Sequence, residues 1–106
     1  MRDRANTVLI VASRLRDASL RARFLAMSRQ FKDWLRQRDG FSRYELFESD
    51  EGWCDTMLWR DRASADDANR AFRATPIAAA FAEIVEPDFH IFYGRSVALG
   101  TSETDR

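Results

Sequence analysis

Residues 41–64 read FSRYELFESDEGWCDTMLWRDRAS, and this stretch decides the fold. Its first part, 41–49, interleaves polar and apolar side chains, which is typical of a strand with one buried face. SDEG at 49–52 has the composition of a turn. Residues 53–60 alternate again and predict a second strand. We therefore expect two antiparallel strands joined by a tight turn.

The residues before this hairpin predict a strand followed by a helix. TVLIVASRL at 7–15 is rich in β-branched and aliphatic types, which indicates a strand buried on both faces. From Ser19 the apolar residues recur at intervals of three and four, the pattern of an amphipathic helix. Asp17 or Ser19 is a candidate cap, and Gly40 is a candidate for the left-handed residue that closes the helix. The apolar positions are Leu20, Phe24, Met27, Phe31, Trp34 and Leu35.

A second helix is expected after the hairpin, with an interruption. Ser64 and Asp67, three residues apart, resemble a capping box in which Asp replaces the usual Glu. Pro76 lacks an N–H and excludes one straight helix, so we expect Thr75 to cap a second segment that starts at Pro76. Pro87 ends that segment.

Residues 88–97, DFHIFYGRSV, predict the last strand. The order is then β-α-β-β-α-β, which predicts an α+β, ferredoxin-like fold with a four-stranded antiparallel sheet and both helices on one face. We expect one domain over residues 1–106, with a core at about 7–97 and polar tails at 1–6 and 100–106. The other sheet face is too apolar to be solvated, which predicts a homodimer through that face.

Composition excludes several classes of protein. The chain has 17 Lys and Arg against 17 Asp and Glu, so no net charge attracts nucleic acid or an anionic membrane. Its apolar runs are too short to span a bilayer or to form a signal peptide, so we expect a cytoplasmic protein. With Cys54 as the single cysteine and His90 as the single histidine, no disulfide within the chain and no Cys/His metal site is expected.

Three local motifs resemble the antibiotic biosynthesis monooxygenase family. They are the Gly40-Phe41 dipeptide that opens a strand, LWRDRAS at 58–64, and the interrupted helix ATPIAAAF at 74–81. The resemblance covers about residues 7–97 and implies a dimeric α+β barrel. The family includes cofactor-free monooxygenases that act on aromatic polyketides and quinols, heme-degrading monooxygenases, and members without an assigned role.

The resemblance to the cofactor-free members carries two residues over. Those proteins have a Trp at the end of the third strand and an Asn four residues earlier, both in a cavity between sheet and helices. Trp59 matches the Trp, whereas Asp55 stands in place of the Asn. A site of this kind needs no cofactor and uses dioxygen with a small aromatic molecule.

The heme-degrading members are matched less well. Their site resembles an Asn on the first strand, with a Trp and a later His in the second helix. Here Ser13 replaces the Asn, Phe72 lies near the Trp position, and the second predicted helix has no His. The axial ligand of a heme is therefore missing.

Alternation along the third strand gives the chemistry a physical basis. Trp53, Asp55, Met57 and Trp59 share one face. If that face meets the helices, desolvation raises the pKa of Asp55, and a carboxylate of this kind is a candidate general base for a phenol or an activated C–H. A purely structural Asp55, solvated or paired with Arg14 or Arg43, is the alternative. Trp59 is a candidate wall and N–H donor, or a core anchor.

Further side chains complete the candidate site. Arg14 is a candidate anion stabiliser if its side chain turns inward, and His90 is a second candidate base or a structural histidine. Tyr44 and Tyr93 are candidate donors near a ligand. Trp34, Met57, Phe72 and Ser13 are candidate lining residues, and the first two also fit simple packing.

Two functions remain open from the sequence. The first is a homodimeric, cofactor-independent monooxygenase for a small aromatic, quinol or polyketide-type substrate, with Asp55 or His90 as base and Trp59 and Arg14 as stabilisers. The second is a non-catalytic protein of the same fold that binds a small ligand or serves an accessory role. A polar-lined cavity between sheet and helices favours the first, and a core closed by Trp59, Trp34 and Phe72 favours the second.

Overall fold

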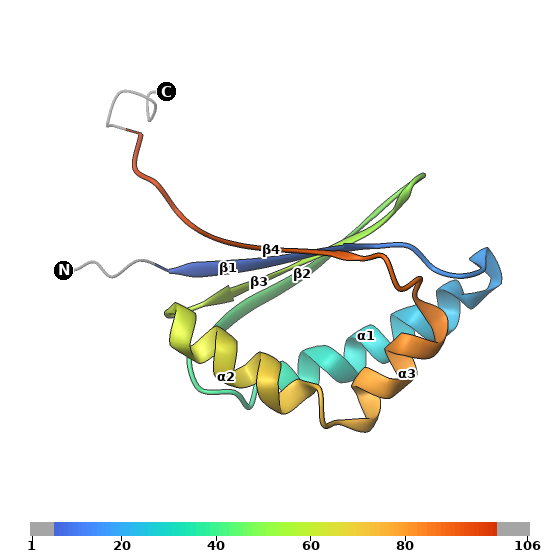
Figure 1. The fold of residues 1–106 in the computed structure, drawn as a ribbon, viewed down its shortest axis with the longest axis horizontal. Helices are drawn as coiled ribbons and strands as arrows, with labels where there is room; N and C mark the ends of the chain where they lie inside the picture. Colours follow the sequence, from blue (N-terminus) through green and yellow to red (C-terminus); the bar gives the residue numbers. More distant parts are fainter. Residues whose placement is uncertain (1–5, 100–106) are drawn as a thin grey trace.

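The computed structural model describes residues 6–99 as a four-stranded sheet covered on one face by helices (Figure 1). Of the predicted tails at 1–6 and 100–106, residues 1–5 and 100–106 lie outside the described residues. The elements in chain order are β1 (Thr7–Ser13), the short 3-10 helix η1 (Ala18–Leu20), α1 (Arg21–Leu35), β2 (Phe41–Ser49), β3 (Gly52–Trp59), α2 (Arg62–Phe72), α3 (Pro76–Ile84) and β4 (His90–Arg95).

The sheet has the order β2-β3-β1-β4, and every neighbouring pair is antiparallel. β1 lies between β3 and β4, so the first and last strands of the chain are neighbours. The helices lie on the same side of the sheet (Figure 1). The predicted ferredoxin-like α+β fold is confirmed.

Local capping explains where the helices begin. Asp17 accepts a hydrogen bond from the Ser19 backbone N–H and caps η1, which leads into α1. Thr75 accepts one from the Ala78 N–H, and Pro76 is the first residue of α3, as predicted. The expected start of α2 was wrong: Asp61 is its cap and accepts from the Ser64 N–H at 2.8 Å.

The first and last strands of the chain are shorter than predicted. β1 ends at Ser13 and β4 spans only 90–95, because the chain beyond β1 turns toward the end of α3. There the Arg16 N–H donates to the Ile84 carbonyl, and Leu15 forms an isolated bridge with Val85.

The core lies between the sheet and the helices. Trp59, Leu35 and Ile84 are its largest completely buried side chains. One cluster surrounds Trp59 and Met57, and another surrounds Phe24 and Ile84. α3 packs against α1, so the helices form one continuous layer. The inward-facing side chains of β3 therefore lie between the sheet and the helices.

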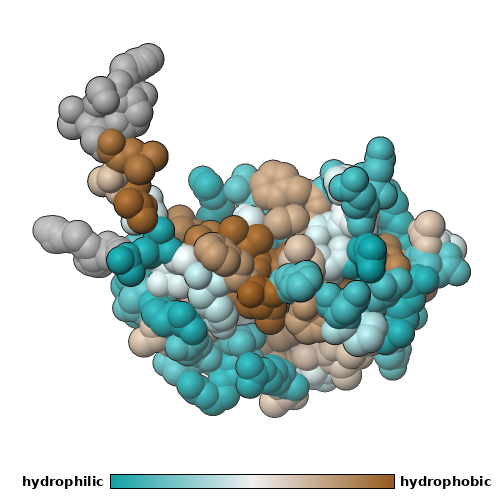
Figure 2. Space-filling model, turned by 45° about the horizontal axis from the view of Figure 1, so that its top comes forward, coloured by the Kyte–Doolittle hydropathy of each residue, from teal (hydrophilic) through white to brown (hydrophobic). Residues whose placement is uncertain are grey.

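The opposite face of the sheet carries no helix, and we call it the open face. Register places Val8 and Ile10 of β1, Leu58 of β3, Phe47 of β2 and Phe92 of β4 on it. Phe47 and Phe92 are 51% and 59% exposed. Apolar side chains gather across this side of the molecule in Figure 2. Within one chain, β1 is therefore covered on one face only, and the prediction of burial on both faces was wrong for the single chain.

Candidate functional site

The strand β3 directs four of its side chains into the layer between the sheet and the helices. Trp53, Met57 and Trp59 are buried there, and Asp55 lies among them, half-buried. The register sets Asp55 between Leu46 of β2 and Val11 of β1. A carboxyl group is thus flanked on both neighbouring strands by aliphatic side chains.

Asp55 has one hydrogen-bonded side chain beside it. The Tyr44 hydroxyl donates to Asp55 Oδ2 over 3.1 Å. Burial raises the pKa of Asp55 to about 6, and the hydrogen bond from Tyr44 opposes that rise. Within residues 6–99, no ion pair involves Asp55. The carboxyl therefore exchanges a proton near neutral pH, which suits a general base.

Tyr44 is a hydroxyl donor fixed by packing. Its ring is buried and meets Phe31 edge-on at 5.5 Å between centroids. Burial, together with the nearby charge of Asp55, raises the pKa of Tyr44, so the phenol keeps its proton. Ser28 of α1 lies close to this hydroxyl, yet its own buried Oγ has no hydrogen-bond partner. Three polar side chains therefore lie close together inside the layer: Asp55, Tyr44 and Ser28.

Ser28 was missed by the sequence reasoning. It occupies the buried stripe of α1, four residues after Phe24 and three before Phe31, and is only 4% exposed. A hydroxyl residue at these intervals within an apolar stripe was the available signal.

The other aromatic candidates fill the layer. Trp34 stacks on Phe31 with a centroid distance of 6.3 Å, and Phe72 meets Phe31 at a tilt with a centroid distance of 4.8 Å. Trp59 is 1% exposed and packs edge-on against Phe41, and its buried indole N–H has no partner. Met57 is buried in the same cluster. These four candidates line the core, and none of them lines the two surface pockets described below.

Tyr93 takes part in a separate contact on β4. Its hydroxyl accepts a hydrogen bond from Asn69 Nδ2 at 3.3 Å, and the Arg62 guanidinium lies over its ring at 3.8 Å. Tyr93 pairs with Leu9 across β1, so it faces the helices near α2. Its hydroxyl therefore serves helix packing.

The structure does not bring Arg14 and His90 to Asp55. Arg14 is exposed and pairs with Asp88 at 3.5 Å and Glu86 at 3.6 Å, so its side chain does not turn inward, which was the condition for its role as an anion stabiliser. His90 is exposed and lies opposite Ala12, whereas Asp55 lies opposite Val11. Adjacent positions on β1 face opposite sides, so His90 and Asp55 lie on opposite faces of the sheet.

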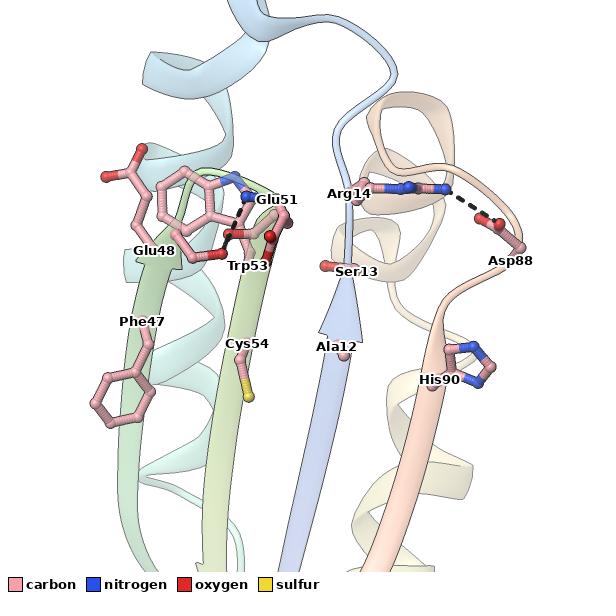
Figure 3. A pocket seen from close by; sticks show the side chains of 12 residues that line it. Ala12, Ser13, Arg14, Phe47, Glu48, Glu51, Trp53, Cys54, Asp88 and His90 are labelled. Carbon is pink, nitrogen blue, oxygen red and sulfur yellow. Dashed lines mark hydrogen bonds and ion pairs between the residues drawn. The ribbon is translucent and has the colours of Figure 1, made fainter.

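Arg14 and His90 instead border a surface pocket at the hairpin end of the open face (Figure 3). Its volume is about 440 Å³, and it is open to solvent. Phe47 and the lone Cys54 lie on its floor, and Ser13 lies at its edge. Burial, and to a smaller extent the charge of Asp55, raises the pKa of Cys54, so this thiol is protonated at neutral pH. A smaller pocket of about 200 Å³ lies between the 36–40 turn and the start of α2.

The described residues carry no group of three His, Cys, Asp or Glu side chains placed to hold a metal ion. Among helices of residues 6–99, none has the length and apolarity to cross a membrane.

Comparisons with known proteins identify the fold. No family model and no curated protein matches the sequence. Among solved structures, a variant of SnoaB, a cofactor-independent oxygenase from Streptomyces nogalater, is 16% identical with a TM-score of 0.69, covering 91% of this chain and 95% of SnoaB. A structure described as an antibiotic biosynthesis monooxygenase is 17% identical with a TM-score of 0.70, over 87% and 99% of the two chains.

A conserved protein from Methanosarcina mazei Go1 is also similar, with 16% identity, a TM-score of 0.72, and coverage of 86% of this chain and 93% of that protein. At these identities the likeness concerns the fold alone. The chain has the fold of the antibiotic biosynthesis monooxygenases, in agreement with the resemblance in its sequence.

Proposed function

We propose that this protein is a cofactor-independent monooxygenase that acts on a small aromatic, quinol or polyketide-type substrate, with Asp55 as the general base. One observation carries the proposal: a half-buried carboxyl group whose pKa is raised to about 6 lies in an aromatic layer, without a cationic partner in residues 6–99. The fold shared with a cofactor-independent oxygenase supports it.

The proposed reaction needs no reductant. For an anthrone, Asp55 removes a proton from the CH₂ group, and the resulting carbanion passes one electron to dioxygen. Recombination forms a C–O bond and a peroxide, which takes a proton back from Asp55. Loss of water then leaves a carbonyl carbon, so that CH₂ and O₂ become C=O and H₂O. The buried indole N–H of Trp59 is the proposed donor to the anion, since it has no partner.

Oxygen consumption by the purified, metal-free protein tests this proposal with a panel of anthrones, hydroquinones and catechols. Wild type is expected to consume oxygen, and Asp55→Ala should lower kcat/KM by at least about 100-fold while the fold is kept. Asp33→Asn is the control, because Asp33 is an exposed acid on α1 whose one ion-pair partner within residues 6–99 is Arg36. Undiminished turnover in Asp55→Ala removes Asp55 as the base.

A non-catalytic ligand-binding or accessory protein is the second candidate. The packing favours it, because Trp34, Trp59 and Phe72 fill the layer and the larger pocket lies on the open face, away from Asp55. No oxygen uptake across the whole panel, together with a small molecule found by mass spectrometry in the protein as purified, would establish this candidate instead.

We further propose that the protein is a homodimer that buries the open face. Phe47 and Phe92 expose more than half of their surface there, beside Val8, Ile10 and Leu58. An apolar sheet face of this kind is stabilised when a second copy covers it.

A further inference from the structure

We infer that Tyr44 is a positioning residue for Asp55, which fixes the direction of the carboxylate and stabilises its ionised form. The inference rests on the proposed role of Asp55 as a base. The inference gives Tyr44 a part in the proposed catalysis by Asp55. Three observations support it: the hydrogen bond between the two side chains, the packing that holds them, and the residues around the carboxyl group.

The register explains why these two side chains meet. Tyr44 lies opposite Met57, and Leu46 lies opposite Asp55, so Tyr44 is the diagonal neighbour of Asp55 on the same face of the sheet. A tyrosine is long enough to reach across such a diagonal. The resulting bond from the hydroxyl to Oδ2 is 3.1 Å long.

The hydroxyl of Tyr44 has no competing partner of good geometry. Ser28 lies close enough to oppose part of the rise in the pKa of Tyr44, but no hydrogen bond of good geometry joins the two hydroxyls, and the buried Ser28 Oγ has no other partner. The ring is held by Phe31 and by burial in the main core cluster, so the hydroxyl direction is set by packing before any ligand binds. A hydroxyl fixed in this way holds the carboxylate of Asp55 in one orientation, which is how a neighbouring residue supports a reactive group.

Apart from Tyr44, the side chains around Asp55 do not hold its carboxyl group in the described residues. In residues 6–99, Tyr44 is the only side chain that hydrogen-bonds to it. β1, β2 and β4 present Val11, Leu46 and Ile91 in the same row, and α1 presents the uncharged Ser28. The titratable groups that sense the charge of Asp55 are Tyr44 and Cys54, whose thiol lies on the other face of the sheet. None of the ion pairs within residues 6–99 includes Asp55.

Titration of Asp55 followed by ¹³C NMR of aspartate carboxyls tests the inference without any substrate. The signal is assigned by its loss in Asp55→Asn. Tyr44→Phe keeps the ring and removes the donor, so the midpoint of Asp55 should rise by about 1 pH unit. Tyr93→Phe is the matched control, because the Tyr93 hydroxyl bonds Asn69 and should leave the midpoint unchanged.

A second measurement covers the case in which Tyr44→Phe does not fold. In this experiment Tyr93→Phe is produced with 3-fluorotyrosine in place of tyrosine. Because the chain has two tyrosines, only Tyr44 then carries the fluorine. Fluorination makes the phenol a stronger donor, and the Asp55 midpoint should then fall. An unmoved midpoint in both experiments, or equal shifts in Tyr44→Phe and Tyr93→Phe, overturns the inference.

The pH profile of oxygen uptake separates this inference from the proposed function. In Tyr44→Phe, the acid limb of kcat/KM should move up by the same amount as the Asp55 midpoint, with activity regained at higher pH. A shifted midpoint without oxygen uptake by any variant removes the base and the positioning role built on it, although the hydrogen bond is real. An active protein with an unmoved midpoint removes the role of Tyr44 and leaves the proposed function intact.

Discussion

At the scale of single residues, the ionised form of Asp55 is destabilised by burial, and the contacts in the fold do not fully compensate. Burial favours its protonated form, and the one hydrogen bond from Tyr44 returns only part of the lost hydration. Each pKa unit corresponds to about 1.4 kcal/mol of differential stability between the two protonation states. A chain that keeps such a group within an aromatic layer gives up stability at neutral pH, which is common at functional sites.

The free energy of unfolding should record this cost through its pH dependence. The pKa of Asp55 is raised from 3.8 to about 6 on folding, so its stabilising contribution is full below about pH 4 and is lost as the pH rises through 6. Relative to Asp55→Asn, wild type should therefore lose about 2–3 kcal/mol between pH 4 and pH 7. Urea unfolding of both proteins at one protomer concentration measures the difference, and a difference that stays flat with pH contradicts the raised pKa.

The sequence allowed part of this site to be predicted. Strand alternation alone placed Asp55 with Trp53, Met57 and Trp59, because a side-chain period of two is a local property. The bond from Tyr44 depends on the register between β2 and β3, which the turn sets and composition does not reveal. The same reason explains why the sequence did not show that Arg14 and His90 lie away from Asp55, because their faces depend on where β1 ends and on its pairing with β4.

At the scale of elements, the type of each helix and strand follows from the local spacing of apolar residues. The residue at which a helix begins is harder to predict, because neighbouring residues can each serve as its cap. Asp61 and Ser64 both suit a helix start, and the sequence does not say which prevails. In the structure Asp61 caps α2 and Ser64 lies in its first turn, where its Oγ accepts a hydrogen bond from Arg60 at 3.0 Å. The break between α2 and α3 was predictable, because Pro76 removes a backbone donor.

Gly40 marks a close approach between the turn before β2 and the start of α2. Its φ is +83°, and a Cβ there would collide with the side chain of Ser64 at the start of α2. Gly40→Ala should therefore destabilise the protein by about 1–3 kcal/mol in chemical unfolding, from both backbone strain and the displaced Ser64.

Gly94 gives the control for this substitution. Its φ is not in the left-handed region, and a Cβ there would meet only the ring of Phe92 on the open face. Both glycine variants are therefore compared in the Phe92→Asp background, which removes this ring and the proposed dimer contact. Gly94→Ala should change the free energy of unfolding by less than about 0.5 kcal/mol. Equal losses in the two variants contradict the role of the left-handed turn at Gly40.

At the scale of the whole molecule, the helices cover one face of the sheet and leave the other uncovered. The helices cover one face and bury Trp59 and Met57, whereas the open face keeps a row of apolar side chains that this chain does not cover. A chain of 106 residues buries a limited core, and covering the open face with a second copy adds to the apolar area removed from water. The apolar character of β1 on both faces was visible in the sequence, and the proposed second copy would cover the face that the helices leave open.

Phe92→Asp tests the proposed dimer. Phe92 is 59% exposed in the single chain, so a charge there should leave the fold intact and disrupt only a dimer formed through the open face. Sedimentation equilibrium should give the mass of a dimer for wild type and of a monomer for Phe92→Asp. Ile91→Asp is matched in strand, charge and exposure, but register places Ile91 on the helix side, so this variant should remain dimeric. A monomeric wild type, or a dimer that survives Phe92→Asp, shows that the open face has another role.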